Sequence, residues 1–180
     1  MNTAVETKTK WAIDTTHSEV QFKVKHLVIA TVTGTFKKFS GSVEAEGEDF
    51  DGAEVDFTID VNSIDTNQAQ RDAHLKSDDF FSAALYRDIT FHNGRLEKEG
   101  NELVLAGDLT IRDVTKRVKL NVEHGGTVVD PYGNTKAGFE INGKINRKDF
   151  GLTWNAVTEA GGLVVGDEVR LHLNIELARV

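Results

Sequence analysis

Cysteine is absent from this chain of 180 residues, and proline occurs once, at Pro131. The absence of cysteine excludes disulfides, thiol catalysis and thiolate metal sites. Proline cannot donate a hydrogen bond to a β-ladder, whereas glycine, which occurs 16 times, suits tight turns. A chain almost free of proline and rich in glycine therefore favours an all-β fold of strands joined by hairpin turns.

Long apolar runs are also missing. No stretch approaches the roughly 20 apolar residues that cross a bilayer as a helix, so we expect no stable membrane insertion. Residues 1–10 lack the apolar core of a signal peptide, which predicts a cytoplasmic location unless the chain is a processed mature form acting in the periplasm. These polar residues are expected to form a disordered tail, and residues 11–180 a single domain.

Positive charge is scarce. The formal net charge is −8, and residues 39–70 contain no Lys or Arg but nine Asp or Glu. An acidic chain is repelled by nucleic acid and by anionic membrane surfaces unless a local basic patch overrides the total charge, so we expect no nucleic-acid partner. The acidic segment is interpreted as a solvated face that keeps the protein soluble.

From Trp11 onward, apolar and polar residues alternate with a period of two. Strict alternation places one face of each strand on an apolar interior and the other face in water. Within each expected strand, the apolar residues occupy every second position. They are Val20, Phe22, Val24, Val55, Phe57, Ile59, Val61, Leu103, Leu105, Leu109, Ile111, Val118, Leu120, Val122, Phe139, Ile141, Ile145, Val169, Leu171, Leu173, Ile175 and Leu177. Turn signals separate the strands at residues 94–100, 113–116, 125–126, 130–134 and 161–162.

One region interrupts the alternation. Residues 67–86 are rich in helix-forming residues, and Asp78 is suited to cap a second short helix. We expect one or two helical turns that cover one mouth of the sheet structure and act as a lid.

About eight strands with one apolar face each can form two packed sheets or one sheet closed into a barrel. An eight-stranded barrel is just wide enough to hold a single ligand, whereas a sandwich fills its interior with its own side chains. Ten Phe and two Trp favour a wide apolar lining, although the same rings could equally fill a dry core. Periodicity alone does not choose between the two architectures.

Short motifs in a fixed order add a second line of inference. They are WAIDTTHSEVQF at 11–22, His26, VTGTF at 32–36, IDT at 64–66, RDAHL at 71–75, DFF at 79–81, GDLTI at 107–111, VTK at 114–116, INRKDFGL at 145–152 and VGDEV at 165–169. In order and spacing these motifs resemble the YceI-like, polyisoprenoid-binding family. The resemblance implies an eight-stranded antiparallel lipocalin-like barrel with a short helical insertion, and a homodimer.

The resemblance also implies a function. The long apolar pore would hold a long-chain isoprenoid lipid, a prenyl pyrophosphate or a prenyl quinone, and the protein would act as a soluble carrier or sequestering protein. We expect no catalysis, and no cofactor other than the bound lipid. Parity and the resemblance together place these residues around the tail: Phe22, Val24, Phe36, Phe57, Ile59, Phe80, Phe81, Phe91, Leu109, Ile111, Phe150, Leu152 and Trp154.

Four basic side chains are candidates for contact with the head group, namely Arg71, His74, Arg147 and His26. Arg71 and His74 stand at i and i+3 of the expected helix and can face the same way. The acidic total charge disfavours a pyrophosphate, so we favour a quinone-like or otherwise weakly charged head group. The alternative interpretation is that the Arg71 cluster is a structural network that fixes the helical insertion to the barrel.

Two other functions stay open at this point. An enzyme acting on an isoprenoid or quinone would need an acid–base group inside the pore, for which His26, of inward parity, and His74 are the candidates. A stress-response protein could have an incidental cavity. No metal site is expected, because the six histidines show no zinc-like close spacing.

Overall fold

Antiparallel strands dominate the computed structural model, which describes residues 8–47, 49–158 and 163–180. The strands are β1 (Thr9–Ile13), β2 (Glu19–His26), β3 (Ala30–Phe36), β4 (Phe39–Ala45), β5 (Glu54–Asp60), β6 (Ile64–Asp65), β7 (Asp88–Glu99), β8 (Glu102–Ile111), β9 (Val114–Val129), β10 (Thr135–Asn146) and β11 (Val165–Arg179). One α-helix, α1 (Ala69–Lys76), and two 3-10 turns, η1 (Val61–Ser63) and η2 (Arg147–Phe150), complete the described part.

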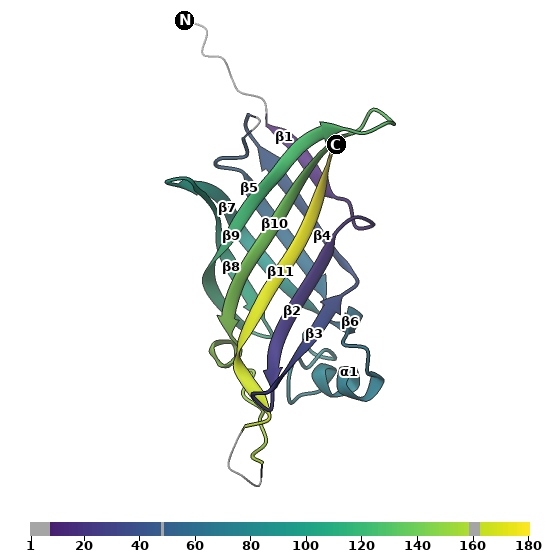
Figure 1. The fold of residues 1–180 in the computed structure, drawn as a ribbon, viewed down its shortest axis with the longest axis vertical. Coiled ribbons are helices and arrows are strands. Elements are labelled where there is room, and N and C mark those ends of the chain that lie inside the picture. Colours follow the sequence, from purple (N-terminus) through teal and green to yellow (C-terminus); the bar gives the residue numbers. More distant parts are fainter. Residues whose placement is uncertain (1–7, 48, 159–162) are drawn as a thin grey trace, which may run out of the picture.

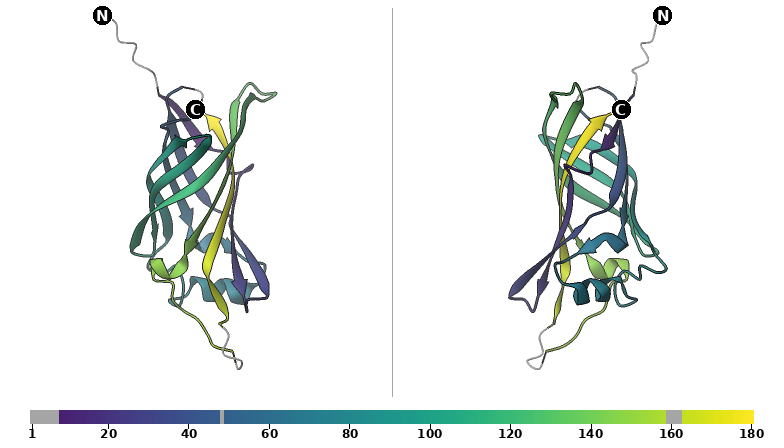
Figure 2. Two further views of the ribbon diagram at one scale, coloured as in Figure 1. Left: turned by 60° about the vertical axis from the view of Figure 1, so that its left-hand side comes forward. Right: turned by 90° about the vertical axis from the view of Figure 1, so that its right-hand side faces the viewer.

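The sheet closes into a barrel (Figure 1). Within the described residues, eight strands follow one another in the order β1–β4–β5–β7–β8–β9–β10–β11, and β1 pairs with β11 to complete the ring. β2, β3 and β6 continue the wall beside β11. The expected eight-stranded barrel is confirmed. Figures 1 and 2 show its two ends: the C-terminus lies at what we call the upper end, and α1 at the lower end.

The strand at the amino end is interrupted, so that β1 and β2 both pair with β11 on either side of a short turn. At this turn the backbone N–H of Asp14 donates to the carbonyl of Glu176 at 2.8 Å. The Ser18 hydroxyl accepts from the backbone N–H of Glu176 at 2.9 Å and so takes the place of a ladder partner. β1 begins at Thr9, so the expected tail is too long by two residues, and residues 1–7 lie outside the described residues.

The helical insertion is confirmed as α1, and it is shorter than residues 67–86 suggest. The side-chain oxygen of Gln68 caps its first turn by accepting from the N–H of Arg71 at 3.0 Å. The second helix expected at Asp78 is wrong, because residues 78–85 form consecutive turns. Ser82, with φ of 49°, donates its hydroxyl to Asp78 at 2.7 Å, and its left-handed backbone ends any helical run.

The turn expected at residues 94–100 falls at the end of that range, because β7 ends at Glu99 and Gly100 has φ of 63°, and the turn expected at residues 125–126 lies inside a strand. β7 runs through Gly94 with a register shift between His92 and Arg95, and β9 runs through residues 125–126 opposite a shift at residues 138–139. Such bulges insert a residue without ending the strand and add the twist that a closed sheet requires. The turn expected at residues 161–162 lies outside the described residues.

Aromatic rings close the upper end of the barrel. Phe50, 1% exposed, lies on the segment between β4 and β5. Its ring centroid is 5.2 Å from Trp11, 4.9 Å from Phe139 and 5.2 Å from His124. We call these four residues the upper plug. A second core cluster, which includes Phe22, packs lower in the barrel near α1.

Candidate functional site

The barrel encloses a long cavity of about 350 Å³. On β11 its lining runs from Val165 to Leu177, which is about 40 Å along a strand at roughly 3.3 Å per residue. Strands of closed barrels tilt by roughly 35–45°, so this corresponds to about 30 Å along the barrel axis. A volume of that size spread over that length describes a narrow channel, suited to one extended chain.

The channel wall contains nearly all of the side chains expected around a lipid tail. The lining includes Phe22, Val24, Phe36, Phe57, Ile59, Phe80, Phe81, Phe91, Leu109, Ile111, Leu152 and Trp154. The expectation that Phe150 lies around the tail is wrong, because Phe150 does not line the channel. It is buried within the lower core cluster, because it stands in η2 and not at an alternating strand position.

The upper half of the channel is formed by residues that the sequence reasoning did not assign to the ligand. They are Ile13, Val43, Leu96, Leu105, Leu120, Val122, Phe139, Ile141, Ile175 and Leu177. Several have the inward parity noted in the sequence. Parity identifies the inner face, but the height of each residue depends on strand register, which only the three-dimensional pairing gives.

Inward-facing glycines make room for two of the lining rings. A Cβ on Gly34 would lie 2.2 Å from Cζ of Phe22, and a Cβ on Gly107 would lie 2.4 Å from Cζ of Phe91. Gly34 is the register partner of Phe22, so the ring lies over the neighbouring strand. The rings thus lie against the wall and leave the channel open.

Arg71 lines the channel from α1 at the lower end. Its Nε donates to the Thr66 hydroxyl at 2.8 Å and its Nη2 donates to the Thr66 carbonyl at 2.6 Å. The Thr66 hydroxyl in turn donates to the Asp72 carboxylate. This network fixes the guanidinium, and Nη1 has no hydrogen-bond acceptor in the described part of the chain.

His74 lies one turn further along α1 and also lines the channel. Its Nε2 is 2.9 Å from Oδ2 of Asp79. Its ring meets the ring of Trp154 edge-on with centroids 4.7 Å apart and that of Phe80 with centroids 5.1 Å apart. Aromatic and aliphatic surface thus surrounds a single imidazole at the lower mouth of the channel.

Arg147 reaches the channel, but its donors are occupied by backbone. The side chain is 3% exposed and donates to the carbonyls of Gly166 at 2.8 Å, Leu152 at 2.6 Å and Trp154 at 2.8 Å. Burial lowers the pKa of Arg147, and the charge of Asp167 opposes this shift. Arg147 therefore holds the segments on both sides of residues 155–164 in place.

His26 corrects a prediction from parity. Although its position continues the inward parity of Val24, it stands at the end of β2 and is exposed at the rim of the channel. Alternation along a strand places a side chain inside the barrel only where strands on the opposite side still enclose it. At His26, the last residue of β2, the barrel wall ends. Arg71, His74 and His26 thus all lie at the lower mouth, while Arg147 lies in the wall beside it.

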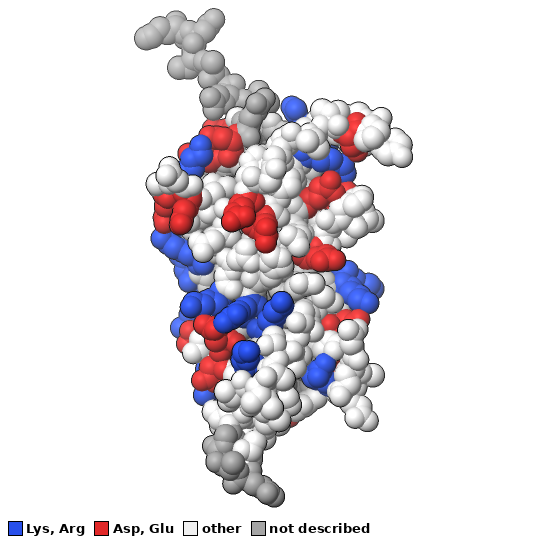
Figure 3. Space-filling model, in the orientation of Figure 1, with Lys and Arg blue, Asp and Glu red and all other residues white. Residues whose placement is uncertain are grey.

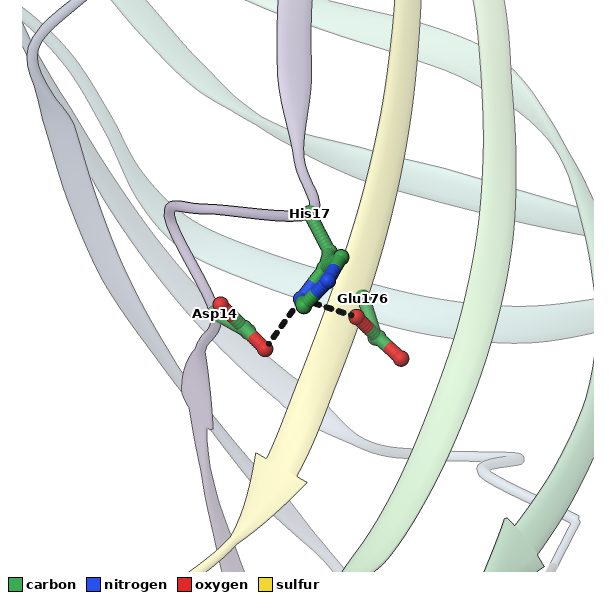
Figure 4. Close-up of side chains that lie close together, drawn as sticks. All are labelled: Asp14, His17 and Glu176. Carbon is green, nitrogen blue, oxygen red and sulfur yellow. Dashed lines mark hydrogen bonds and ion pairs between the residues drawn. The ribbon is translucent and has the colours of Figure 1, made fainter. Parts of the chain in front are cut away.

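A separate polar cluster lies on the outside, at the break between β1 and β2 (Figure 4). Nδ1 of His17 is 2.9 Å from Oδ2 of Asp14 and 3.2 Å from Oε2 of Glu176, and Nζ of Lys136 is 2.9 Å from the same Asp14 oxygen. The Thr16 hydroxyl, His17 and Lys136 hold the pKa of Asp14 well below its usual range. The hydrogen bond and charge of Asp14, followed by the charge of Glu176, raise the pKa of His17.

Three residues of this cluster, Asp14, His17 and Glu176, offer oxygen and nitrogen atoms close enough to share a metal ion. The Lys136 ammonium already occupies the Asp14 oxygen that faces them. The geometry is that of an ion-pair network that joins the turn between β1 and β2 to β11 and β10. Among the described helices, none is long and apolar enough to cross a membrane.

Comparison with known proteins gives consistent matches along most of the chain. The model of the YceI-like domain matches residues 11–177. Protein YceI of Salmonella newport is 39% identical over 89% of this chain and 81% of its own length. The crystal structure of the Campylobacter jejuni YceI protein is 34% identical, covers 87% of this chain and 90% of its own, and superposes with a TM-score of 0.71.

A further solved structure shares the fold at lower identity. It is a polyisoprenoid-binding domain from Saccharophagus degradans, implicated in plant cell wall breakdown. It is 18% identical, covers 94% of this chain and 98% of its own, and has a TM-score of 0.67.

Proposed function

This chain belongs to the YceI-like family, and we propose that it binds one long-chain isoprenoid lipid with the tail inside the channel and the head group at the lower mouth. The observation that carries the proposal is the shape of the channel: narrow, apolar and about 30 Å long. A related fold described as polyisoprenoid-binding supports the choice of ligand. The protein would serve as a carrier or sequestering protein.

The energetics favour a tail ligand. Burial of apolar surface contributes about 0.8 kcal/mol per CH₂ group, so a chain of several isoprene units binds tightly without a single polar contact. The upper plug of Trp11, Phe50, His124 and Phe139 closes the far end of the channel. The tail would therefore enter from the lower end, with its head group last.

The head group would lie between Arg71 and His74. Arg71 Nη1 is the available guanidinium donor, whereas Arg147 is engaged with backbone carbonyls and would act as a positioning residue. Asp79 beside His74 and Asp72 beside Thr66 add negative charge close to the mouth. A quinone-like head that needs one or two donors fits these surroundings better than a pyrophosphate.

The proposal includes no catalytic step. Acid–base catalysis requires an ionisable group within hydrogen-bond reach of the reacting atom. Of the ionisable residues in the channel lining, Arg71, His74 and Arg147 lie at or beside the lower mouth and His26 is at the rim. The other two, Lys25 and Asp56, have exposed side chains, and Asp56 pairs with His92 at 2.7 Å. The channel walls above them are apolar. A homodimer, implied by the family resemblance, is part of the proposal, and light scattering on the purified protein tests it.

The test is extraction followed by reconstitution. Protein purified from a bacterial host under mild conditions should carry a prenyl lipid that native mass spectrometry detects and organic extraction identifies. Protein stripped of lipid should bind added prenyl quinones. A folded protein that arrives empty and binds neither long-chain prenyl quinones nor prenyl pyrophosphates contradicts the proposal.

Arg71→Ala tests the head group, with Lys76→Ala as a matched control. Lys76 lies on the same helix, carries the same charge and does not line the channel. Removal of the Arg71 side chain should lower the affinity for a quinone of given tail length about tenfold, because a hydrogen bond from a charged donor is lost. A strong, salt-sensitive preference for the pyrophosphate that disappears in Arg71→Ala would show that the bound head group is charged.

A further inference from the structure

Apolar side chains are exposed at the lower end, on two neighbouring loops. Between β2 and β3, Val28 is 75% exposed and Ile29 85% exposed, with Leu27 beside them. On the segment before β11, Val157 and Leu163 are exposed and form an isolated bridge with each other. We call these five residues the portal tip. Isolated exposed apolar residues are common, but a group on adjacent loops calls for an explanation.

The portal tip adjoins the mouth of the channel. His26 and Val164, the sequence neighbours of Leu27 and Leu163, both line the channel. The backbone N–H of Leu27 donates to the carbonyl of Val164 at 2.9 Å, which ties the two loops together. Figure 1 shows the β2–β3 turn at the lower end of the barrel, at about the same height as α1. A lipid entering the channel from below would pass directly along these side chains.

The backbone of the portal tip is strained in a way that its residues do not favour. Leu27 has φ of 53° and Val28 has φ of 65°. Turns with two successive positive φ values are normally built from Asn, Asp or Gly, and a β-branched residue in this region is a genuine outlier. Here the chain has bulky apolar residues at both positions. Strain of this kind is typical of functional segments.

The charges on the β2–β3 hairpin, which ends in the portal tip, are positive. Residues 20–38 contain four Lys and no Asp or Glu. Lys23 and Lys25 are exposed on β2 and form no ion pair in the described part of the chain. Lys23 is the register partner of Arg170, and Arg170 that of Lys144. Arg170 and Lys144 both pair with Glu168, at 3.8 Å and 3.5 Å, so Lys23 and Lys25 are the cations on this face that the described residues leave for a partner. Figure 3 shows Lys and Arg side chains in the middle and lower part of this face, with Asp and Glu side chains beside some of them.

We propose that the portal tip inserts into the headgroup region of an anionic bilayer, so that the channel opens directly onto the membrane. Apolar side chains at the interface with cations nearby are the combination that binds anionic membrane surfaces. The inference rests on the proposed function, because it supplies the route by which an insoluble lipid reaches the channel without crossing water.

Charge favours a bilayer over a second copy of the chain as the occupant. A two-fold contact through the portal tip would bring Lys23 and Lys25 of two copies close together, and like charges oppose such a contact. Anionic lipid head groups complement the same lysines. The upper end also exposes apolar residues, Val128, Val129 and Tyr132, on the β9–β10 hairpin. That hairpin lies at the plugged end and serves as the matched control.

The absence of cysteine allows a site-specific test. Ile29→Cys and, as the control, Tyr132→Cys each introduce one thiol that can be labelled with an environment-sensitive fluorophore. Vesicles of phosphatidylcholine with about one third phosphatidylglycerol are then added. We expect a blue shift and a severalfold gain of emission at position 29 and little change at position 132. A response at position 132 alone, or at neither position, overturns the proposal.

A second variant tests the consequence for loading. Val28→Asn with Ile29→Ser keeps residues compatible with the turn and removes the apolar surface. We expect at least tenfold weaker vesicle binding and a similarly slower transfer of a prenyl quinone from vesicles, while binding of the same quinone delivered from detergent is unchanged. Equal vesicle binding by wild type and variant overturns the proposal.

The remaining outcomes separate this proposal from the proposed function. Wild type that binds vesicles through the portal tip but takes up no prenyl lipid from vesicles or detergent upholds the docking surface and contradicts the lipid cargo. If the variant with the changed portal tip takes up the prenyl quinone from vesicles as fast as the wild type does, the lipid cargo is upheld and docking is overturned. A wild-type dimer that becomes monomeric in the variant, with no vesicle binding by either, identifies the tip as a contact between copies and also overturns it.

Discussion

The closed upper end of the channel should set an upper limit to the length of the bound tail. Val43 on β4 is buried, lines the channel and is the register partner of Trp11 in the upper plug. In Val43→Phe the larger ring would occupy the end of the channel. A tail that fills the wild-type channel would then have to leave about one isoprene unit unburied.

The size of the effect follows from the burial of carbon. An isoprene unit has five carbons, and at about 0.8 kcal/mol per buried CH₂ group its loss costs up to about 4 kcal/mol. Because 1.4 kcal/mol corresponds to a factor of ten, affinity for the full-length tail should fall by roughly 10²- to 10³-fold. A tail one unit shorter should bind both proteins equally well. The ring itself should lower stability by about 1–3 kcal/mol at most, as overpacking does.

The assay is a titration with prenyl quinones of increasing length, run in parallel on wild type, Val43→Phe and Val24→Phe. Val24 lines the channel on β2, near the lower mouth. Every tail must pass Val24, so Val24→Phe should lower the affinity for prenyl quinones of all tail lengths by the same factor. Urea unfolding confirms that each variant is folded. If Val43→Phe weakens short and long tails equally, or neither, the upper plug does not end the binding site.

Three further outcomes follow from the structure. In His17→Gln the loss of stability relative to wild type should be largest below pH 6.5, the ordinary pKa of His, and should shrink as pH rises through the raised pKa of His17, because Asp14 and Glu176 stabilise the protonated ring more than the neutral one. Thermal melts at several pH values measure this loss, and a difference that grows with pH contradicts the prediction. Arg147→Lys should lose about 2–4 kcal/mol in urea unfolding, since an ammonium cannot reach several carbonyls at once, and a value near zero would leave the buried guanidinium without a structural role. Gly34→Ala should push the Phe22 ring into the channel and reduce quinone affinity at least tenfold; unchanged affinity would mean that the ring moves elsewhere.

The sequence was sufficient to predict which residues face the inside of the barrel, but not how far along the barrel axis each of them lies. Alternation depends only on the neighbouring residues, so the inward parity of Phe22, Leu109 and Ile111 could be predicted one strand at a time. The vertical position of a residue depends on register shifts such as those between His92 and Arg95 and at residues 138–139. Those shifts come from contacts between strands, and a glycine signals a turn and a bulge equally well.

The polar predictions differed in outcome for a related reason. Arg71 and His74 were placed together because their spacing on a helix is a local property. Arg147 appeared equivalent in sequence, yet its partners are carbonyls of residues 152, 154 and 166, which come together only in the folded loop. The Asp14, His17 and Glu176 cluster has the same origin, because Glu176 is brought to the turn by the last strand of the barrel.

The plugged upper end leaves the lower end, beside α1, as the place where such a channel can exchange its ligand. In a channel open at both ends, a lipid could leave in either direction, because water could fill the space behind the departing tail. With Phe50 buried among its neighbouring rings, the tail must be withdrawn through one mouth. Withdrawal into water exposes each isoprene unit in turn at about 0.8 kcal/mol per carbon, which makes spontaneous release extremely slow. A carrier of this design therefore needs an apolar acceptor at its mouth, and the apolar residues Val28 and Ile29 stand where that acceptor would have to be.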